Sequence, residues 1–152
     1  MTLEDVFCRL HGIDQAAQTL IREAGFSFDT GFAEDITLPP DNPDTRFLKE
    51  SACLLLDPLE EMHNLLSYLE TPVSPEYVLE EFENGRYGYQ NENGSRREFS
   101  CGQTLEARIT DRFGCLRWVK TMMEHDGDDY FLMGHRSVPL AGLTVRERRQ
   151  RI

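Results

Sequence analysis

The stretch Tyr77–Gln90, YVLEEFENGRYGYQ, carries the clearest folding signal in the chain. Its Asn84-Gly85 dipeptide lies between two runs of strand-forming residues, and Asn-Gly in that setting is the strongest short-range signal for a β-hairpin. Before this point the sequence is acidic and has a helical pattern. After it, arginines, aromatic residues and turn signals become frequent. We therefore predict an α+β protein whose first part is helical and whose second part is built from strands.

Charge also changes at this hairpin. Residues 1–85 hold 4 Lys/Arg against 18 Asp/Glu, whereas residues 86–152 hold 12 against 9, which together give the net charge of −11. The acidic residues 76–84 already belong to the predicted β part, so some of the contrast is expected to be internal pairing. We predict an acidic helical hairpin over residues 1–73. A small β domain with a short basic C-terminal tail follows over residues 74–152.

Size and composition are those of a globular protein. A chain of 152 residues with 39% hydrophobic and 28% charged residues can bury a core without metals or disulfides. No apolar run approaches the ~20 residues that cross a bilayer. The first residues, MTLEDVFCRLHG, carry acids where a signal peptide has basic residues. We expect a cytoplasmic location and no membrane partner.

The first predicted helix has clear ends and an apolar stripe. Thr2 and Asp5 form a capping pair at its start, and Gly25 is a suitable stop. The stripe recurs at steps of three and four and consists of Val6, Leu10, Ile13, Ala17, Leu20 and Ala24.

A second predicted helix begins at Asn42-Pro43, with asparagine as cap and proline in the first turn. The preceding residues 26–41 are expected to form a loop whose Phe26, Phe28 and Phe32 pack on the helices. The helix either kinks at Pro58 or stops and restarts with Asp57 as cap, and the unbroken phase of its stripe favours a kink. That stripe consists of Leu48, Ala52, Leu55, Leu59, Met62, Leu66 and Leu69.

Two stripes of matched period predict an antiparallel helical hairpin. The second helix would be roughly 40 Å long, more than one small β domain covers, so we expect a homodimer through both helices. Packing of the helices on the β domain of a monomer is the open alternative. The acidic outer faces are a solvated surface or a surface for a basic protein partner, with the partner residues expected at Glu50, Asp57, Glu60 and Glu61.

Short strands follow one another through the second part. Further turns are expected at Asn93-Gly94 and Asp126-Gly127. Strands are expected around residues 96–99, 105–109, 116–123, 130–133 and 140–146. This pattern predicts a small antiparallel β-barrel or a strongly twisted sheet, similar to an SH3 domain.

An ordered set of short motifs resembles a known family. The motifs are Asn84-Gly85-Arg86-Tyr87, Cys101-Gly102 with Leu105-Glu106, Trp118 with Thr121 and Glu124, Tyr130-Phe131-Leu132, and Leu140-x-Gly142-Leu143-x-Val145-Arg146. Over residues 77–148 they resemble a domain-of-unknown-function family of small proteins, found largely in Firmicutes on conjugative or phage-related elements. The resemblance implies a small β-barrel and supplies no activity and no catalytic residue.

The chain shows no complete catalytic motif. Gly-rich phosphate loops and the G-x-S-x-G elbow are missing from the sequence, and its four histidines are scattered. The four cysteines lack C-x-x-C spacing, and Cys8 with His11 supplies only two of the roughly four ligands that zinc needs. We predict a non-enzymatic protein without metal or cofactor.

Binding is the better-supported chemistry. Cations and aromatic residues mix along the predicted strands, as in small barrels that bind nucleic acid. The candidate residues are Arg86, Tyr87, Tyr89, Arg96, Arg97, Arg108, Arg117, Trp118 and Lys120. Alternatively, Trp118 and the tyrosines belong to the core and the arginine stems cover sheet edges. The negative net charge also opposes attraction to nucleic acid.

We therefore expect an interaction protein of a mobile element that binds a protein partner through its acidic helices. A host enzyme that acts on nucleic acid is one such partner. The alternative function is nucleic-acid binding through the β domain. The basic run Arg146–Arg151 could then touch phosphate, or it could touch an acidic helix of the same or a second chain.

Overall fold

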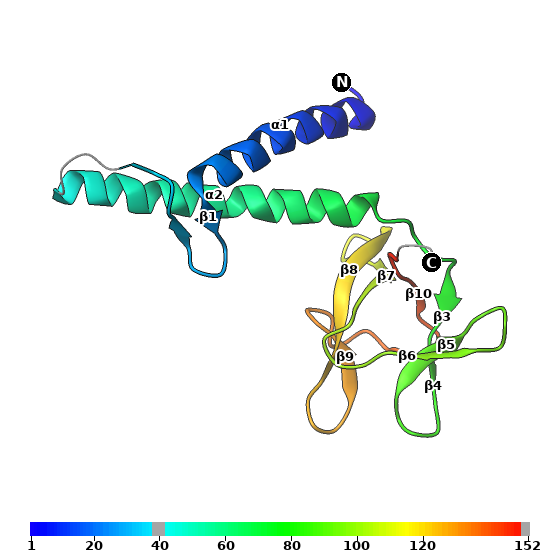
Figure 1. The fold of residues 1–152 in the computed structure, drawn as a ribbon. Coiled ribbons are helices and arrows are strands. Elements are labelled where there is room, and N and C mark those ends of the chain that lie inside the picture. The colour runs from blue at the N-terminus through cyan, green and yellow to red at the C-terminus, as the bar shows by residue number, and fades with distance from the viewer. Residues whose placement is uncertain (38–41, 150–152) are drawn as a thin grey trace. The chain divides into compact units, whose positions relative to one another are not determined.

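The computed structural model describes residues 1–37 and 42–149. The described chain has a mixed α+β fold with two helices and ten strands in three antiparallel sheets (Figure 1). It divides into two compact units, Met1–Glu70 and Thr71–Ile152, called here the helical unit and the β unit. The predicted α+β class is confirmed. Neither described helix contains a segment long and apolar enough to span a membrane.

Helix α1 (Leu3–Ala24) begins with the predicted capping box. The Thr2 hydroxyl accepts a hydrogen bond from the Asp5 backbone at 3.1 Å, and the Asp5 carboxylate accepts one from the Thr2 backbone at 2.7 Å. The helix ends at Gly25, whose φ of 62° lies in the left-handed region that glycine adopts without strain. Both ends of α1 thus follow from the sequence.

Helix α2 (Pro43–Glu70) begins after Asn42, whose side-chain oxygen accepts a hydrogen bond from the Thr45 backbone at 2.9 Å. The predicted cap is therefore confirmed. The helix continues through Pro58, so the alternative in which it stops and restarts at Asp57 is wrong. Proline lacks the N–H that would bond the Leu54 carbonyl, yet the flanking turns keep the helix continuous.

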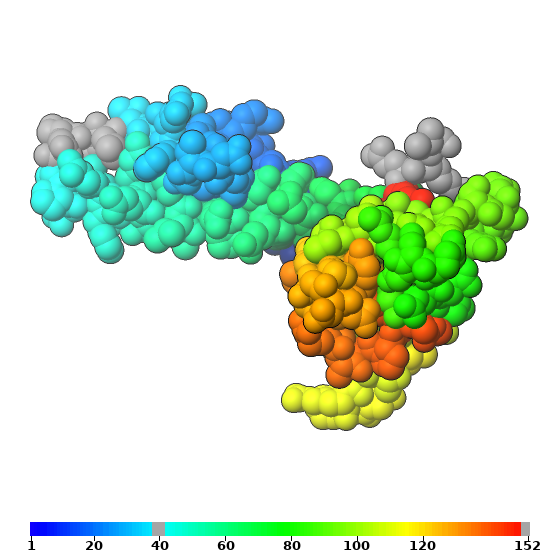
Figure 2. All heavy atoms as spheres, turned by 90° about the horizontal axis from the view of Figure 1, so that it is seen from below, coloured from blue at the N-terminus to red at the C-terminus, as the bar shows by residue number. Residues whose placement is uncertain are grey.

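A short hairpin connects the helices. Strands β1 (Phe26–Ser27) and β2 (Phe32–Ala33) pair here, where a loop was predicted; residues 38–41 of that loop lie outside the described residues. Phe26 is buried, but Phe32 is 67% exposed, so the expected packing of Phe32 is wrong. Neighbouring strand residues point to opposite sides, and the small Ala33 takes the inner position. Figure 2 shows this hairpin in light blue against α2.

The packed faces of α1 and α2 differ from the predicted stripes by one residue. His63 of α2 contacts Asp14 of α1, while Gln18 contacts Glu60, so the helices run in opposite directions where they touch. Because His63 gives the Asp14 carboxylate a partner, this polar residue can occupy the interface. Buried positions of α1 are Asp14, Ala17, Ile21 and Ala24.

The other half of each predicted stripe remains on the surface. Exposed members in α1 are Val6, Ile13 and Leu20, and those in α2 are Leu48, Leu55 and Leu69. Part of each stripe is therefore left uncovered by the packing of α1 on α2.

The larger sheet of the β unit has five strands in the order β3-β10-β7-β8-β9. Its strands are β3 (Tyr77–Val78), β7 (Thr104–Thr110), β8 (Leu116–His125), β9 (Tyr130–Leu132) and β10 (Thr144–Arg146). The alternation predicted for β7 is confirmed, since Leu105, Ala107 and Ile109 are buried. Strand β10 is shorter than predicted, and Leu140 is buried outside a strand.

The smaller sheet has the order β4-β5-β6, with β4 (Glu80–Glu81), β5 (Tyr87–Gln90) and β6 (Arg96–Glu98). The predicted turns at Asn84-Gly85 and Asn93-Gly94 join its strands, with glycine φ angles of 79° and 75°. Both hairpins are confirmed.

The predicted first strand is split at Leu79. The Leu79 backbone donates to the Leu143 carbonyl and accepts from the Gly142 N–H, both at 2.8 Å. The chain thereby leaves the five-stranded sheet after β3 and enters the three-stranded sheet at β4. Both sheets cover one core, built from Leu79, Tyr89, Phe99, Leu105, Ala107, Ile109, Met123, Leu132, Leu140 and Val145.

None of the described sheets closes into a barrel. Strands β3 and β9 are edges of one sheet, and β4 and β6 are edges of the other. The barrel alternative is therefore wrong, because the split at Leu79 divides the strands between two sheets. Similarity to an SH3 domain stays a prediction.

Candidate functional site

The predicted Arg/aromatic residues lie in different parts of the β unit. The three-stranded sheet and its turns hold Arg86, Tyr87, Tyr89, Arg96 and Arg97. Residues Arg108, Trp118 and Lys120 share one face of the five-stranded sheet, whereas Arg117 lies on the other because strand side chains alternate. The structure thus brings together only part of the set.

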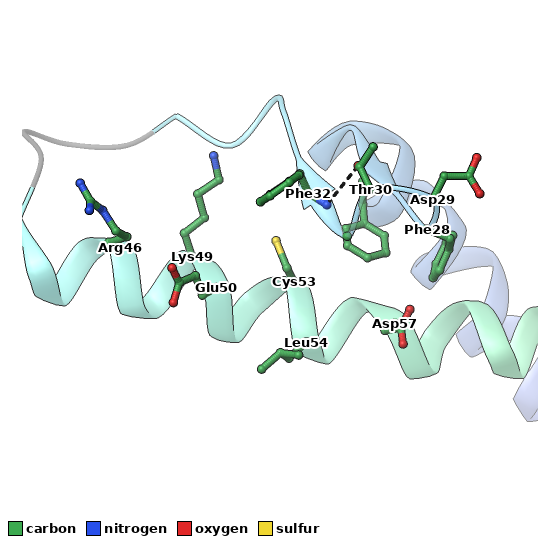
Figure 3. A pocket seen from close by; sticks show the side chains of 12 residues that line it. Phe28, Asp29, Thr30, Phe32, Arg46, Lys49, Glu50, Cys53, Leu54 and Asp57 are labelled. Carbon is green, nitrogen blue, oxygen red and sulfur yellow. Dashed lines mark hydrogen bonds between the residues drawn. The ribbon is translucent and has the colours of Figure 1, made fainter.

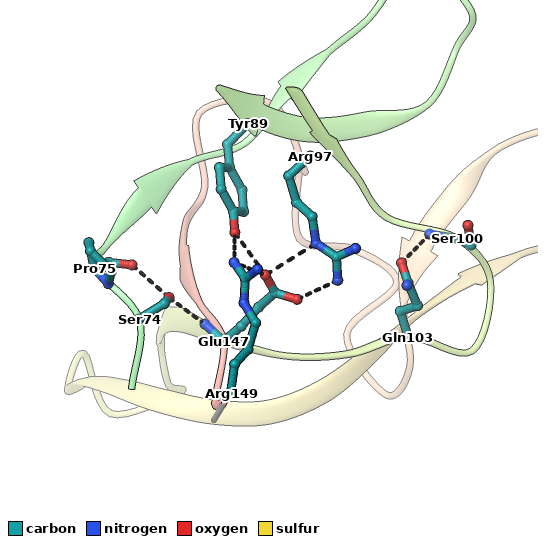
Figure 4. A network of polar contacts seen from close by, with 8 residues as sticks. All are labelled: Ser74, Pro75, Tyr89, Arg97, Ser100, Gln103, Glu147 and Arg149. Carbon is teal, nitrogen blue, oxygen red and sulfur yellow. Dashed lines mark hydrogen bonds and ion pairs between the residues drawn. The ribbon is translucent and has the colours of Figure 1, made fainter. Parts of the chain in front are cut away.

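Glu147 is the centre of a polar network in the β unit (Figure 4). This residue is only 4% exposed. Its carboxylate accepts a hydrogen bond from the Tyr89 hydroxyl at 2.8 Å and contacts Arg97 at 2.8 Å and Arg149 at 2.7 Å. Its backbone N–H donates to the Ser74 hydroxyl at 2.9 Å. The network therefore ties β5 and β6 to the segments at both ends of the β unit.

Tyr89 belongs to the core and is not a surface binding residue. Its ring stacks on Tyr77 with centroids 3.9 Å apart and is 2% exposed. Burial and the neighbouring Glu147 carboxylate raise the pKa of Tyr89, so its hydroxyl stays protonated and keeps donating at physiological pH. The alternative that tyrosines serve the core is correct for Tyr89.

Glu106 is a second buried acid, also 4% exposed. One carboxylate oxygen contacts Arg146 at 2.6 Å and the other contacts Arg148 at 2.5 Å. With Arg149 on Glu147, these pairs hold the described part of the basic C-terminal run within the β unit. Contact of this run with phosphate or with an acidic helix stays a prediction, and Gln150 and Arg151 lie outside the described residues.

Arginines of the three-stranded sheet and its first turn are also paired internally. Arg96 contacts Glu83 and Glu98, each at 2.7 Å, and lies over the Phe82 ring at 3.7 Å. Arg86 lies 3.9 Å from Glu98. These contacts join the acidic strand to the Arg-bearing strands, as the charge of residues 76–84 suggested.

Trp118 is the centre of a mixed aromatic and cationic face. The guanidinium carbons of Arg146 and Arg108 lie 4.1 and 5.9 Å from its ring, and the exposed Lys120 follows on the same side of β8. Arg108 also lies 3.6 Å from Glu76. This face has the chemistry of a stacking platform, although acids partly neutralise its cations.

The acids predicted as a partner surface lie mostly together on α2. Glu50, Asp57 and Glu61 are exposed. Their spacings of seven and four residues place them along one side of the helix. Glu60 instead accepts a hydrogen bond from Gln18 of α1 at 3.3 Å.

Two histidines that looked scattered in the sequence face acids between the helices. His63 Nδ1 lies 2.9 Å from Asp14, and His11 Nε2 lies 3.4 Å from Glu70. The hydrogen bond with Asp14 raises the pKa of His63, and the charges of Asp14, Glu60 and Glu70 raise it further. Separations of 49 residues for His63 and Asp14 and 59 residues for His11 and Glu70 hide such pairs from sequence patterns.

A groove of about 700 Å³ lies between α2 and the β1–β2 hairpin (Figure 3). Its apolar lining consists of Phe26, Phe28, Phe32, Cys53 and Leu54, and its charged lining consists of Asp29, Arg46, Lys49, Glu50 and Asp57. No sequence pattern indicated this groove, because its walls come from segments that were predicted as a loop and as a helix surface.

Residues 1–37 and 42–149 contain no group of three His, Cys, Asp or Glu side chains placed to hold a metal. The four cysteines are free, and the Cys101 thiol lies 3.2 Å from Glu124. The described geometry thus offers pairs and networks with structural roles, without a recognisable catalytic constellation.

A family model, DUF5348, matches residues 78–147. This family is described as a domain of unknown function, and its model matches most of the β unit and none of the helical unit. No curated protein and no solved structure matched the chain. The predicted likeness to a domain of unknown function is confirmed, while the Firmicutes and mobile-element setting stays a prediction.

The segment that matches the DUF5348 model contains both buried acids of the β unit. Glu106, Glu147, Tyr89 and Arg97 lie within it, whereas Arg149 lies just outside. The sequence reasoning missed the roles of the two acids. The alternation of Arg and Glu over Arg146–Arg148 was a signal, since side chains at alternate strand positions face different surroundings.

Proposed function

We propose that this protein is a non-enzymatic interaction protein that forms a homodimer through its helical unit. The observation that supports this is a double series of surface apolar residues. Exposed Val6, Ile13 and Leu20 recur every seven residues on α1. Leu48, Leu55 and Leu69 follow the same seven-residue spacing on α2, together with the half-buried Met62. Such spacing is typical of helices that pack on further helices.

Both series lie on the same side of the helix pair. Each precedes the packed positions by one residue, and the helices run in opposite directions where they touch. A rotation of about 100° per residue therefore turns both series toward the same side. Two copies that join these faces would make a four-helix arrangement that buries the exposed leucines.

Helix lengths support an interface of useful size. At about 1.5 Å per residue, the 22 residues of α1 and 28 residues of α2 span roughly 33 and 42 Å. Stable interfaces bury about 800 Å² per partner, which a face of this length supplies.

Light scattering of the full chain tests the dimer. At 50 μM, we expect a mass of about twice 17.6 kDa. The double variant Ile13→Glu with Leu55→Glu should be monomeric with unchanged helix content. Leu116→Glu places the same charge at an exposed leucine of the β unit and should leave the dimer intact. A wild-type mass of 17.6 kDa would refute the proposal.

We further propose a basic protein as the partner of the acidic side of α2, such as a host enzyme that acts on nucleic acid. Glu50, Asp57 and Glu61 support this because they are exposed on one side of the helix. The triple variant to Lys should abolish co-purification with a partner that the wild type captures. If the triple variant retains every captured protein, the acidic surface is not the binding site.

Nucleic-acid binding is the second candidate, supported by the face around Trp118. Fluorescence anisotropy with single-stranded and duplex oligonucleotides tests it. Binding should weaken steeply with salt, and Arg108→Gln with Lys120→Gln should reduce it. Arg117→Gln, on the other sheet face, is the matched control. No binding at low salt would exclude this function.

A further inference from the structure

We propose that the groove between α2 and the β1–β2 hairpin binds an amphipathic carboxylate, a molecule with one acid group and an unbranched apolar tail such as a fatty acid. This small-molecule site goes beyond the interaction function proposed above. Its volume of about 700 Å³ lies within the range of roughly 300–1,000 Å³ that is usual for small-molecule sites.

The apolar lining fits a hydrocarbon tail. Phe28 extends from the hairpin toward α2, while Phe32 lies along the groove on the side to which Cys53 points (Figure 3). Phe32 is largely exposed, so a tail laid across it would remove apolar surface from water. The Thr30 hydroxyl in this lining already accepts a hydrogen bond from the Phe32 backbone.

The charged residues give the groove a direction. Arg46 and Lys49 lie toward the start of α2, whereas Asp29 and Asp57 lie toward the other end (Figure 3). Both cations line the groove although residues 1–85 contain only 4 Lys/Arg. An acid group is therefore expected at the Arg46 and Lys49 end, away from the two aspartates.

Lys49 is the residue that we assign to the acid group. Among the residues that the structure describes, no carboxylate lies within 4.0 Å of its ammonium group. Figure 3 shows Lys49 on the same side of α2 as Cys53 and Phe32, so a bound carboxylate and its tail can contact all three. Glu50 also lines the groove, which favours a ligand with a single charge over a larger anion.

Thiol protection in the full-length protein tests the site. Cys53 lines the groove, while the exposed Cys8, Cys101 and Cys115 are internal references. Decanoate, below the concentration at which it forms micelles, should slow alkylation of Cys53 at least threefold in a saturable manner. The alkylation rates of the three reference cysteines should change by less than about twofold. Decyltrimethylammonium has the same tail and the opposite charge, and it should give no saturable protection.

Two variants of the protein test separately how the groove binds the acid group and the apolar tail of the ligand. Lys49→Gln should raise the decanoate concentration for half-protection about two- to fivefold, as for a partly exposed ion pair. Phe32→Ser should raise it about tenfold because an apolar contact is lost. Arg9→Gln removes a cation of α1 outside the groove lining and should change nothing.

Equal protection by both amphiphiles, or an unchanged curve for Lys49→Gln, would overturn the proposal. Protection of all four cysteines would do the same, because it indicates general coating of apolar surface. If Cys53 reacts too slowly, the same titrations can be followed by the amide NMR signal of Gly31 in the groove. A shift of that signal by decanoate alone supports the site, and its absence refutes it.

Discussion

Gly88 occupies a position in β5 where no side chain fits. A Cβ added there would collide with the Arg97 carbonyl oxygen and come within 2.8 Å of the Phe82 ring. The backbone of β6 cannot move away without breaking its ladder with β5. We expect Gly88→Ala to lower the free energy of unfolding of the β unit by about 3 kcal/mol.

Urea unfolding followed by Trp118 fluorescence measures this effect. Gly31→Ala, at a position with open space and a positive φ in the helical unit, is the control and should leave this transition unchanged. If Gly88→Ala unfolds at the same urea midpoint as the wild type, the sheet can accommodate a methyl group at this position.

Glu147 has an equally defined role at the residue scale. Glu147→Gln keeps the shape of the side chain but leaves Arg97 and Arg149 without their shared carboxylate. Breaking a buried pair typically costs about 3–5 kcal/mol, and the exposure of both arginines reduces the expected loss to about 2 kcal/mol.

Arg117→Gln is the matched control for Glu147→Gln. Arg117 lies 4.0 Å from Asp111 and is mostly exposed, so its loss should cost less than about 0.5 kcal/mol. Equal effects of both variants on the unfolding midpoint would contradict the importance of the Glu147 network.

Local signals at single residues were predictable from the sequence. Thr2, Asn42 and Asn84-Gly85 act through neighbours a few positions away, so their roles follow from short-range chemistry. The partners of Glu106 and Glu147 were not predictable, because Tyr89 and Glu147 are 58 positions apart. Only the paired strands bring such residues together.

At the scale of elements, the helices show where pattern reasoning loses accuracy. The apolar period correctly located α1 and α2, but the packed face was displaced by one residue toward Asp14. A hydropathy pattern counts aspartate as a surface residue, whereas in the structure one oxygen of the buried Asp14 carboxylate lies 2.9 Å from His63 Nδ1. The displaced leucines are the basis of the proposed dimer.

The contact between α1 and α2 should depend on pH through His63. Asp14, Glu60 and Glu70 raise the pKa of His63 in the folded protein above the ordinary value of 6.5, and His11 lies at the same interface. The added stability is therefore complete below about pH 6.5 and is lost as pH rises through the higher folded pKa. Since the side chain is partly exposed, the effect is below about 1 kcal/mol.

Urea unfolding followed by far-UV circular dichroism at pH 6 and pH 8.5 measures this contribution of His63 to stability. His63→Gln should destabilise the helical unit more at pH 6 than at pH 8.5. His135→Gln in the β unit should show no such difference. A larger loss at pH 8.5 would reverse the expected sign and disprove the pairing.

At the scale of the whole molecule, two separate cores predict two unfolding transitions. Ile21, Ala33 and Leu56 belong to one core, and Phe99 and Val145 belong to the other. Helical circular dichroism should report the first transition and Trp118 fluorescence the second. Gly88→Ala should move only the second, and coincident shifts of both would contradict independent units.

The division of the chain into helical and β parts was predictable, because the helical period of apolar residues ends at Leu69 and the charge changes after Gly85. The distribution of strands between two sheets was not. Residues 77–81 have the pattern of one strand, and only the backbone bonds of Leu79 to residues 142 and 143 divide it.

Leu79 also determines where the chain can be lengthened. An epitope inserted between Tyr77 and Glu81 would disturb strand pairing in both sheets, because this short segment contributes β3 to one sheet and β4 to the other. The turn at Asn93-Gly94 connects neighbouring strands of a single sheet and has open space around its glycine. That turn is the better place for a tag or a reporter.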